Sequence, residues 1–235
     1  MPRPRSRVRY GVTAPGLAAR MVSRTVPSVD PWTAGEMFVS PHVEERRRGL
    51  AILTGSEAAR RSSLTPHLLA SRVDEPDLGL RAQIVAALAD YYEVRGREFR
   101  YPAELRAAVT VELQGWDRPQ VLALLALPAA AAEGRLKLPA EVLRRLFQRI
   151  PNASSQLTRL AGDRALEVRL RQAAVQVIGL VGFTDAAPAL SGLCLRLEGR
   201  SAGQLTMLFA PRDFPEDQAL LPALRETLRL LEDDG

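Results

Sequence analysis

The chain has 235 residues, of which 46 % are hydrophobic and only 5 % aromatic, and its formal net charge is +5. Runs of β-branched and aromatic residues are scarce, so the composition argues against a sheet-rich fold and predicts an all-α protein with a core of Leu, Ala and Val. The single cysteine, Cys194, excludes an intramolecular disulfide and favours a reducing compartment, which we take to be the cytoplasm.

The positive charge is concentrated at the N-terminus. Residues 1–29 contain six of the 32 basic residues and none of the 27 acidic ones, so residues 30–235 carry 26 basic and 27 acidic side chains. A body without net positive charge is not the usual footprint of a protein that grips DNA with its main surface. The candidate partner-binding residues are therefore those of the N-terminal segment: Arg3, Arg5, Arg7, Arg9, Tyr10, Arg20 and Arg24.

Residues 1–40 contain several prolines and glycines, which predict an extended arm without a regular helix, apart from a short one around 17–23. Trp32, Met37 and Phe38 are expected to pack the end of this arm against the first helical hairpin. The arm has four alternatives that the sequence leaves open. It is an inert solvated terminus, or it binds an acidic protein, RNA or DNA, or an anionic membrane surface.

From residue 41 onward, apolar residues recur at helical spacing between prolines and glycines. The longest apolar run, 121–132, is shorter than the roughly 20 residues of a membrane-spanning helix, so no such helix is expected. The predicted helices are 44–54, 62–72, one opened by residues 74–77 that runs to Tyr91, 102–113, 120–132 with a break at Pro128, 140–149, one ending at 160, one capped by Asp163 and running to 181, 186–197, 204–209 and 216–232.

Residues 163–197 show the repeating unit most clearly. Two amphipathic helices joined at Gly182 make a hairpin of about 35 residues, the size of an α-solenoid unit. Residues 80–89 can be laid over residues 170–179 with an arginine at the second position of each, and the offset of 90 residues equals two units of about 45. Arg47 begins a weaker copy.

The stretch 170–179, followed by Asp185-Ala-Ala-Pro-Ala-Leu190, resembles a HEAT repeat, and it is most similar to the bacterial HEAT-like repeats first named for phycobilisome lyases. This resemblance covers residues 41–197 and implies an α-α superhelix of about four or five irregular hairpins. It divides the chain into a basic arm, 1–40, and a HEAT-like α-solenoid, 41–235, with a C-terminal capping helix. Proteins of this group are mostly binding scaffolds, and a few are lyases or DNA glycosylases.

Residues that could carry chemistry are few. His42, His67 and Cys194 are the only imidazole and thiol groups, too few for a zinc or iron site of the usual kind. The sequence contains neither a phosphate-binding glycine loop nor a serine nucleophile elbow. We expect no cofactor and no catalytic set, and we expect Cys194 to be a buried, unreactive thiol.

Two further features have a structural and a functional interpretation. Trp116 and Asp117 could serve a glycosylase as stacking ring and carboxylate, but we favour Asp117 as a helix cap. The only aromatic concentration fills a gap between hairpins, with a peptide- or base-stacking surface as the alternative. Its members are Tyr91, Tyr92, Phe99 and Tyr101.

The sequence therefore favours a non-enzymatic scaffold for protein–protein interaction, a subunit or adaptor of a larger bacterial assembly. The alternatives are a nucleic-acid-binding protein that uses the arm and, less favoured, a lyase or glycosylase. Oligomeric state is left open.

Overall fold

The computed structural model describes residues 30–204 and 215–233. Nearly all regular structure in these ranges is helical, which confirms the all-α prediction. The elements are α1 (Pro31–Phe38), α2 (Val43–Gly55), α3 (Glu57–Arg60), α4 (Leu64–Ala70), α5 (Leu78–Asp90), β1 (Val94–Arg95), β2 (Glu98–Phe99), α6 (Ala103–Gln114), α7 (Arg118–Ala132), α8 (Ala140–Phe147), α9 (Ala153–Gly162), α10 (Val168–Val181), the 3-10 helix η1 (Thr184–Ala186), α11 (Ala187–Gln204), α12 (Pro215–Gln218) and α13 (Leu221–Asp233).

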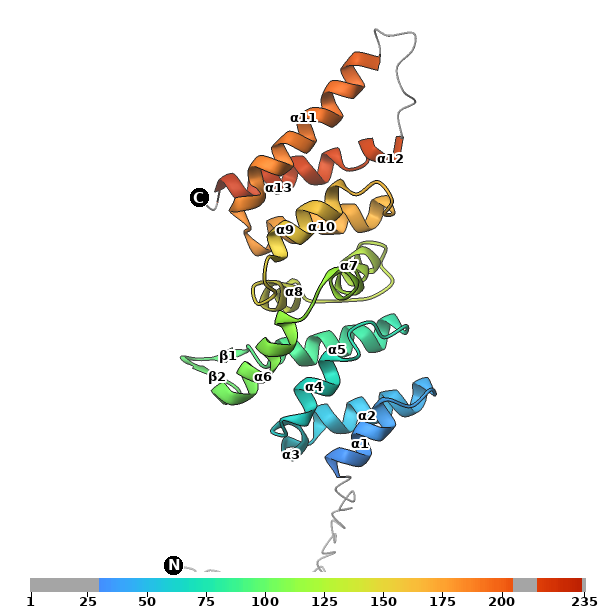
Figure 1. The fold of residues 1–235 in the computed structure, drawn as a ribbon, viewed down its shortest axis with the longest axis vertical. Coiled ribbons are helices and arrows are strands. Elements are labelled where there is room, and N and C mark those ends of the chain that lie inside the picture. The colour runs from blue at the N-terminus through green and yellow to red at the C-terminus, as the bar shows by residue number, and fades with distance from the viewer. Residues whose placement is uncertain (1–29, 205–214, 234–235) are drawn as a thin grey trace, which may run out of the picture.

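The helices follow one another along the long axis of the molecule, from α1 and α2 at one end to α11 and α13 at the other (Figure 1). One row runs through the whole length: α2 packs on α5, α5 on α7, α7 on α10, and α10 on α13. The other helices lie beside this row, with α4 against α5 and α6, α8 against α5 and α10, and α9 against α10 and α11. The molecule is thus a stack in which helices contact mainly their neighbours, and the helices do not surround a single centre.

Leu, Ala and Val side chains form a continuous buried seam along the stack, from Ala34 in α1 to Leu231 in α13. The predicted helical spacing accounts for this seam in α5, where Leu80, Ile84 and Leu88 are buried on one face. Each pair of neighbouring helices contributes a part of the core, so no helix can bury its apolar face alone.

A repeated arginine marks the row. Arg46, Arg81 and Arg171 each occupy the fourth position of their helices, α2, α5 and α10. Because α7 packs on both α5 and α10, the helices that carry Arg81 and Arg171 are two steps apart in this row. The predicted start of the weaker repeat at Arg47 is wrong by one residue. The arginine that matches Arg81 and Arg171 in position is Arg46, which is buried, whereas Arg47 is exposed.

The N-terminal boundary of the helical part is earlier than predicted. Residues 31–38 form α1, which packs on α2, so the prediction of irregular chain up to residue 40 is wrong there. Pro31 at the first helical position is compatible with a helix start, because its missing N–H has no partner at that position anyway. Phe38 is fully buried as expected, whereas Trp32 is 64 % exposed and does not pack against the hairpin.

Other boundaries also differ from the predictions. Helix α10 begins at Val168, so Asp163 does not cap it; the Asp163 carboxylate instead accepts a hydrogen bond from the N–H of Ala165. Helix α7 runs through Pro128 without the predicted break. The two short strands were not predicted. Helix α11 continues to Gln204, and α12 and α13 replace the single helix 216–232; most of the predicted helix 204–209 lies outside the described residues.

Within the described ranges, no helix combines the length and the apolar character that crossing a membrane requires.

Candidate functional site

The predicted partner-binding residues Arg3, Arg5, Arg7, Arg9, Tyr10, Arg20 and Arg24 all lie outside the described residues. Their role in partner binding therefore stays a prediction. The described part of the chain includes a larger polar hollow and a larger apolar groove.

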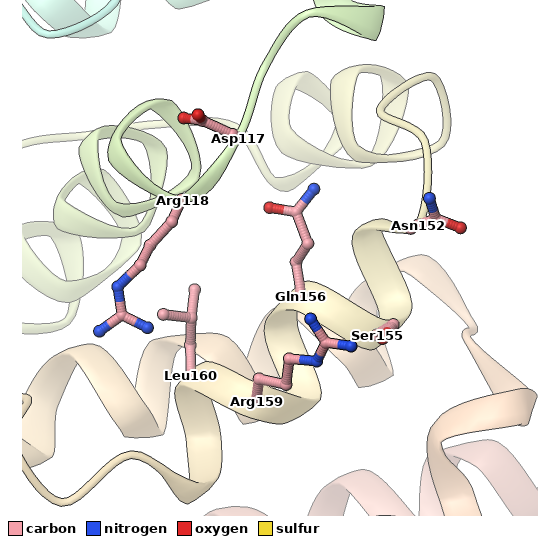
Figure 2. A pocket seen from close by; sticks show the side chains of 7 residues that line it. All are labelled: Asp117, Arg118, Asn152, Ser155, Gln156, Arg159 and Leu160. Atoms are coloured by element: carbon pink, nitrogen blue, oxygen red, sulfur yellow. The ribbon is translucent and has the colours of Figure 1, made fainter.

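The polar surface is a hollow of about 530 Å³ between the start of α7 and helix α9. In Figure 2, the Arg118 side chain extends from α7 on one side of Leu160, and Arg159 lies on the other side, close to Ser155. The Gln156 side chain points from α9 toward the segment that contains Asp117. This α7–α9 hollow is lined by Asp117, Arg118, Asn152, Ser155, Gln156, Arg159 and Leu160.

The charges around the α7–α9 hollow balance. Arg118 Nη2 lies 2.5 Å from Asp163 Oδ2. The hydrogen bond from Arg118, together with the N–H of Ala165, holds the pKa of Asp163 below its ordinary value. The guanidinium of Arg159 and the carboxylate of Asp117 make no ion pair with any residue that the structure describes. The hollow can thus accept a polar group, but it has no excess of either charge.

The geometry of Trp116 and Asp117 bears on the glycosylase alternative. The N–H of Asp117 donates to Gln120 Oε1 at 3.2 Å, so Asp117 lies at the helix start that the sequence predicts. The Trp116 side chain is only 7 % exposed, so its ring is not accessible for stacking on a base. The pair therefore does not present an acid and an aromatic ring together on a surface.

The apolar surface is made of two adjoining hollows that share Gln176 and Leu180 of α10. One, of about 370 Å³, lies between α7, α8 and α10, and the other, of about 500 Å³, lies between α10 and α13. Leu230 at its edge is 37 % exposed. This α10 groove is lined mostly by aliphatic side chains: Pro128, Ala131, Ala132, Leu138, Ala140, Leu143, Val177, Leu180, Ala219, Pro222, Ala223 and Leu230 with Gln172, Gln176, Glu226 and Thr227.

The three tyrosines of the aromatic cluster fill space inside the protein, which is the structural role predicted for them. Tyr91, Tyr92 and Tyr101 belong to the buried core, and the ring centroids of Tyr91 and Tyr101 are 4.7 Å apart. Burial raises the pKa of the Tyr91 hydroxyl, which donates to the carbonyl of Arg60. Phe99 differs, because its side chain is 40 % exposed on strand β2.

The histidines and the cysteine occupy separate places. His42 precedes α2 at its cap position, and His67 Nδ1 lies 2.9 Å from Glu112 Oε1 on the surface. Cys194 is buried, and burial together with the neighbouring carboxylate of Glu198 raises the pKa of its thiol. No group of three or more His, Cys, Asp or Glu residues suited to a metal ion occurs in residues 30–204 and 215–233.

No protein-family model, no curated protein and no solved structure matches this chain.

Sequence reasoning missed the α10 groove. Its lining comes from residues 128 to 230, so no single window of the sequence contains it. The only local signal is the run of small residues after Pro128, which leaves space where larger side chains would fill the gap between helices.

Proposed function

We propose that this chain is a non-enzymatic interaction scaffold, built as an irregular HEAT-like α-solenoid that works as a subunit or adaptor of a larger bacterial assembly in the cytoplasm. An arginine at the fourth position of α2, α5 and α10, buried in α2 and α10 and half-buried in α5, supports a repeated architecture. An α-α superhelix of this kind offers a long semi-rigid surface to a partner.

The α10 groove is the observation that carries this proposal. It is apolar and open to solvent, and it extends over the C-terminal part of α7, α8, α10 and α13. Clefts lined mainly by apolar side chains with a few polar groups are typical binding sites of proteins. A groove of this kind fits an apolar segment of a partner protein, with Gln172, Gln176 and Glu226 at its polar edge.

Affinity purification from the cells that make the protein tests the proposal. Ala131→Arg and Leu230→Arg place a charge at the two ends of the groove, and each is expected to reduce partner recovery by at least about tenfold. Leu195→Arg is the matched control, since Leu195 on α11 is 68 % exposed and does not line the groove. Recovery of no stable partner by the wild-type chain, or equal loss with the control, would contradict the proposal.

Nucleic-acid binding through the arm is the second candidate. The charge distribution favours it. Residues 1–29 contain six arginines and no acidic residue, whereas the rest of the chain has nearly balanced charge. Deletion of residues 1–29 is then expected to abolish a salt-sensitive gel shift with single- or double-stranded probes. A gel shift that survives this deletion would remove the candidate.

A further inference from the structure

The only strands in the described ranges form a small hairpin on an otherwise helical stack. Strands β1 and β2 pair antiparallel, with Val94 opposite Phe99 and Arg95 opposite Glu98. Gly96 in the turn has a φ of 66°, a conformation that favours glycine. The hairpin projects from the side of the stack next to α6 (Figure 1).

One face of the hairpin is apolar and exposed. Val94 and Phe99 lie side by side because side chains of directly opposite residues share a face. They are 53 % and 40 % exposed. Arg95 and Glu98 are on the opposite face, since successive side chains of a strand alternate. Two exposed apolar side chains are thus presented on a projection from the stack.

Stacked arginines adjoin this face. The guanidinium carbon of Arg106 lies 3.8 Å from the centroid of the Phe99 ring, and that of Arg149 lies 5.3 Å from the centroid of the Tyr92 ring. The Tyr92 side chain also connects to α6, because its hydroxyl donates to the backbone carbonyl of Arg106 at 3.4 Å and lies 2.9 Å from Thr110 Oγ1. The guanidinium of Arg106 is therefore stacked on the Phe99 ring of β2, and that of Arg149 lies over the ring of Tyr92, which follows α5.

These guanidiniums have no carboxylate of their own in the described part of the chain. Arg106 and Arg149 form no ion pair there, and neither does Arg97 in the hairpin turn, whereas the neighbouring Arg95 and Arg100 both pair with Glu93. A guanidinium stacked on a ring still presents its N–H groups in its own plane, where a carboxylate can accept two of them. The surface thus combines fixed donors with an exposed apolar pair.

We propose that Val94 and Phe99 of the hairpin, together with the nearby arginines Arg97, Arg106 and Arg149, dock an acidic segment of a partner protein that carries an apolar side chain between carboxylates. The inference rests on the proposed scaffold role and names a second contact, separate from the α10 groove. Arginine and aromatic side chains are the residues that most often dominate the binding energy of protein interfaces.

A protein partner fits this surface better than nucleic acid. Val94 cannot stack on a base, and an aliphatic side chain is complementary to another apolar side chain. Residues 30–235 have 26 basic and 27 acidic side chains, so the body does not supply the general attraction on which binding of a polyanion depends.

Fluorescence anisotropy with the full chain tests the proposal. The probes are a labelled peptide of alternating Glu and Leu, a second with Gln in place of Glu, a third with Ser in place of Leu, and a labelled oligothymidylate. We expect only the Glu–Leu peptide to bind well. The variant Arg106→Gln/Arg149→Gln is expected to raise its Kd by at least about tenfold.

The matched control is Arg169→Gln/Arg229→Gln, which removes the same charge from arginines that are 49 % and 59 % exposed and paired with carboxylates elsewhere. This control is expected to bind the Glu–Leu peptide as the wild type does. Equal losses in both variants, no loss in the hairpin variant, or no binding of the peptide at all would overturn the proposal. Tighter binding of oligothymidylate that is lost only in the hairpin variant would also overturn it, because the surface would then serve nucleic acid.

The Leu230→Arg variant separates this inference from the proposed function, since it alters the α10 groove and leaves the hairpin intact. If Leu230→Arg reduces partner recovery but Arg106→Gln/Arg149→Gln leaves peptide binding unchanged, only the inference about the hairpin fails. If the wild-type chain recovers no partner from cells, the scaffold role fails whatever the peptide does.

Discussion

The guanidinium of Arg46 holds the carboxylate of Glu75 by two hydrogen bonds, from Nη2 to Oε1 at 2.7 Å and from Nε to Oε2 at 2.9 Å. The Glu75 side chain is completely buried just before α5. Arg171 of α10 makes a similar ion pair with Asp217, which lies in α12 just before α13, through one hydrogen bond from Nη1 to Oδ1 at 2.6 Å. Each arginine thus links its helix to the connection that leads into the next helix of the row.

Replacement of Arg46 by Met is expected to destabilise the protein by about 3 to 5 kcal/mol, because it removes the main partner of a buried carboxylate. Arg47→Met is the control: Arg47 is 44 % exposed in its pairs with Glu44 and Asp77, and such pairs contribute at most about 1 kcal/mol. The double variant Arg46→Met/Glu75→Leu should recover much of the loss. Urea denaturation measures all three, and similar losses for Arg46→Met and Arg47→Met would show that burial of the pair is unimportant.

Acid is expected to weaken the same junctions. Burial by itself would raise the pKa of Glu75, but the hydrogen bonds from Arg46 and the Asp77 N–H and the nearby guanidiniums outweigh it and hold the pKa below its ordinary 4.5. The folded state therefore binds the proton less readily than the unfolded chain. The resulting stability is fully present above about pH 4.5 and is lost as the pH falls through the lower folded-state pKa.

The urea midpoint of the wild type should thus fall more steeply below about pH 4.5 than that of Arg46→Met/Glu75→Leu, which lacks the titrating group. The Asp217 carboxylate, whose pKa is likewise held low by Arg171 and Arg164 against the effect of burial, leaves a residual slope in both proteins. Parallel curves for the two proteins would contradict this account.

The all-α fold and most helices of the stack could be predicted because their apolar residues recur at helical spacing. In α5 and α10 that spacing coincides with burial, and Gly182 ends α10 in the left-handed conformation, with a φ of 80°. These features are local, and local spacing is what a sequence displays directly.

Features that depend on tertiary neighbours could not be predicted. Helix α1 contains Gly35 between Pro31 and Phe38, so its composition suggests a loop, and packing on α2 stabilises it. The hairpin has strands of two residues each, too short for a period to be recognised. The candidate surfaces join side chains from separate helices, and the sequence gives no measure of their distances.

The contact between α1 and α2 should be sensitive to a single methyl group. A Cβ on Gly49 would lie 2.5 Å from the backbone N of Phe38 and 2.7 Å from the carbonyl oxygen of Ala34. Because backbone atoms cannot turn aside as a side chain can, Gly49→Ala is expected to push the helices apart and cost about 1 to 3 kcal/mol.

Gly192→Ala is the control for this prediction, since Gly192 lies inside α11 with no atom within 4 Å of an added Cβ. It is expected to stabilise the protein by up to about 1 kcal/mol through helix propensity. Thermal denaturation, with limited proteolysis to detect release of α1, measures both. A stabilising effect of Gly49→Ala would mean that the two helices separate at little cost.

Pro128 in α7 allows a test of how the groove and the helix are related. The helix continues to Ala132 although Pro128 has no N–H to donate to the carbonyl of the preceding turn, and its ring lines the α10 groove. Pro128→Ala restores the donor and removes an unfavourable residue, so we expect a gain of about 1 to 3 kcal/mol in unfolding free energy. Pro119→Ala in the first turn of the same helix should change stability little, because proline is tolerated there. If Pro128→Ala raises the thermal midpoint but reduces partner recovery, the role of the proline is to shape the groove. A lower midpoint would instead show that packing of the proline ring stabilises the protein by more than the lost hydrogen bond destabilises the helix.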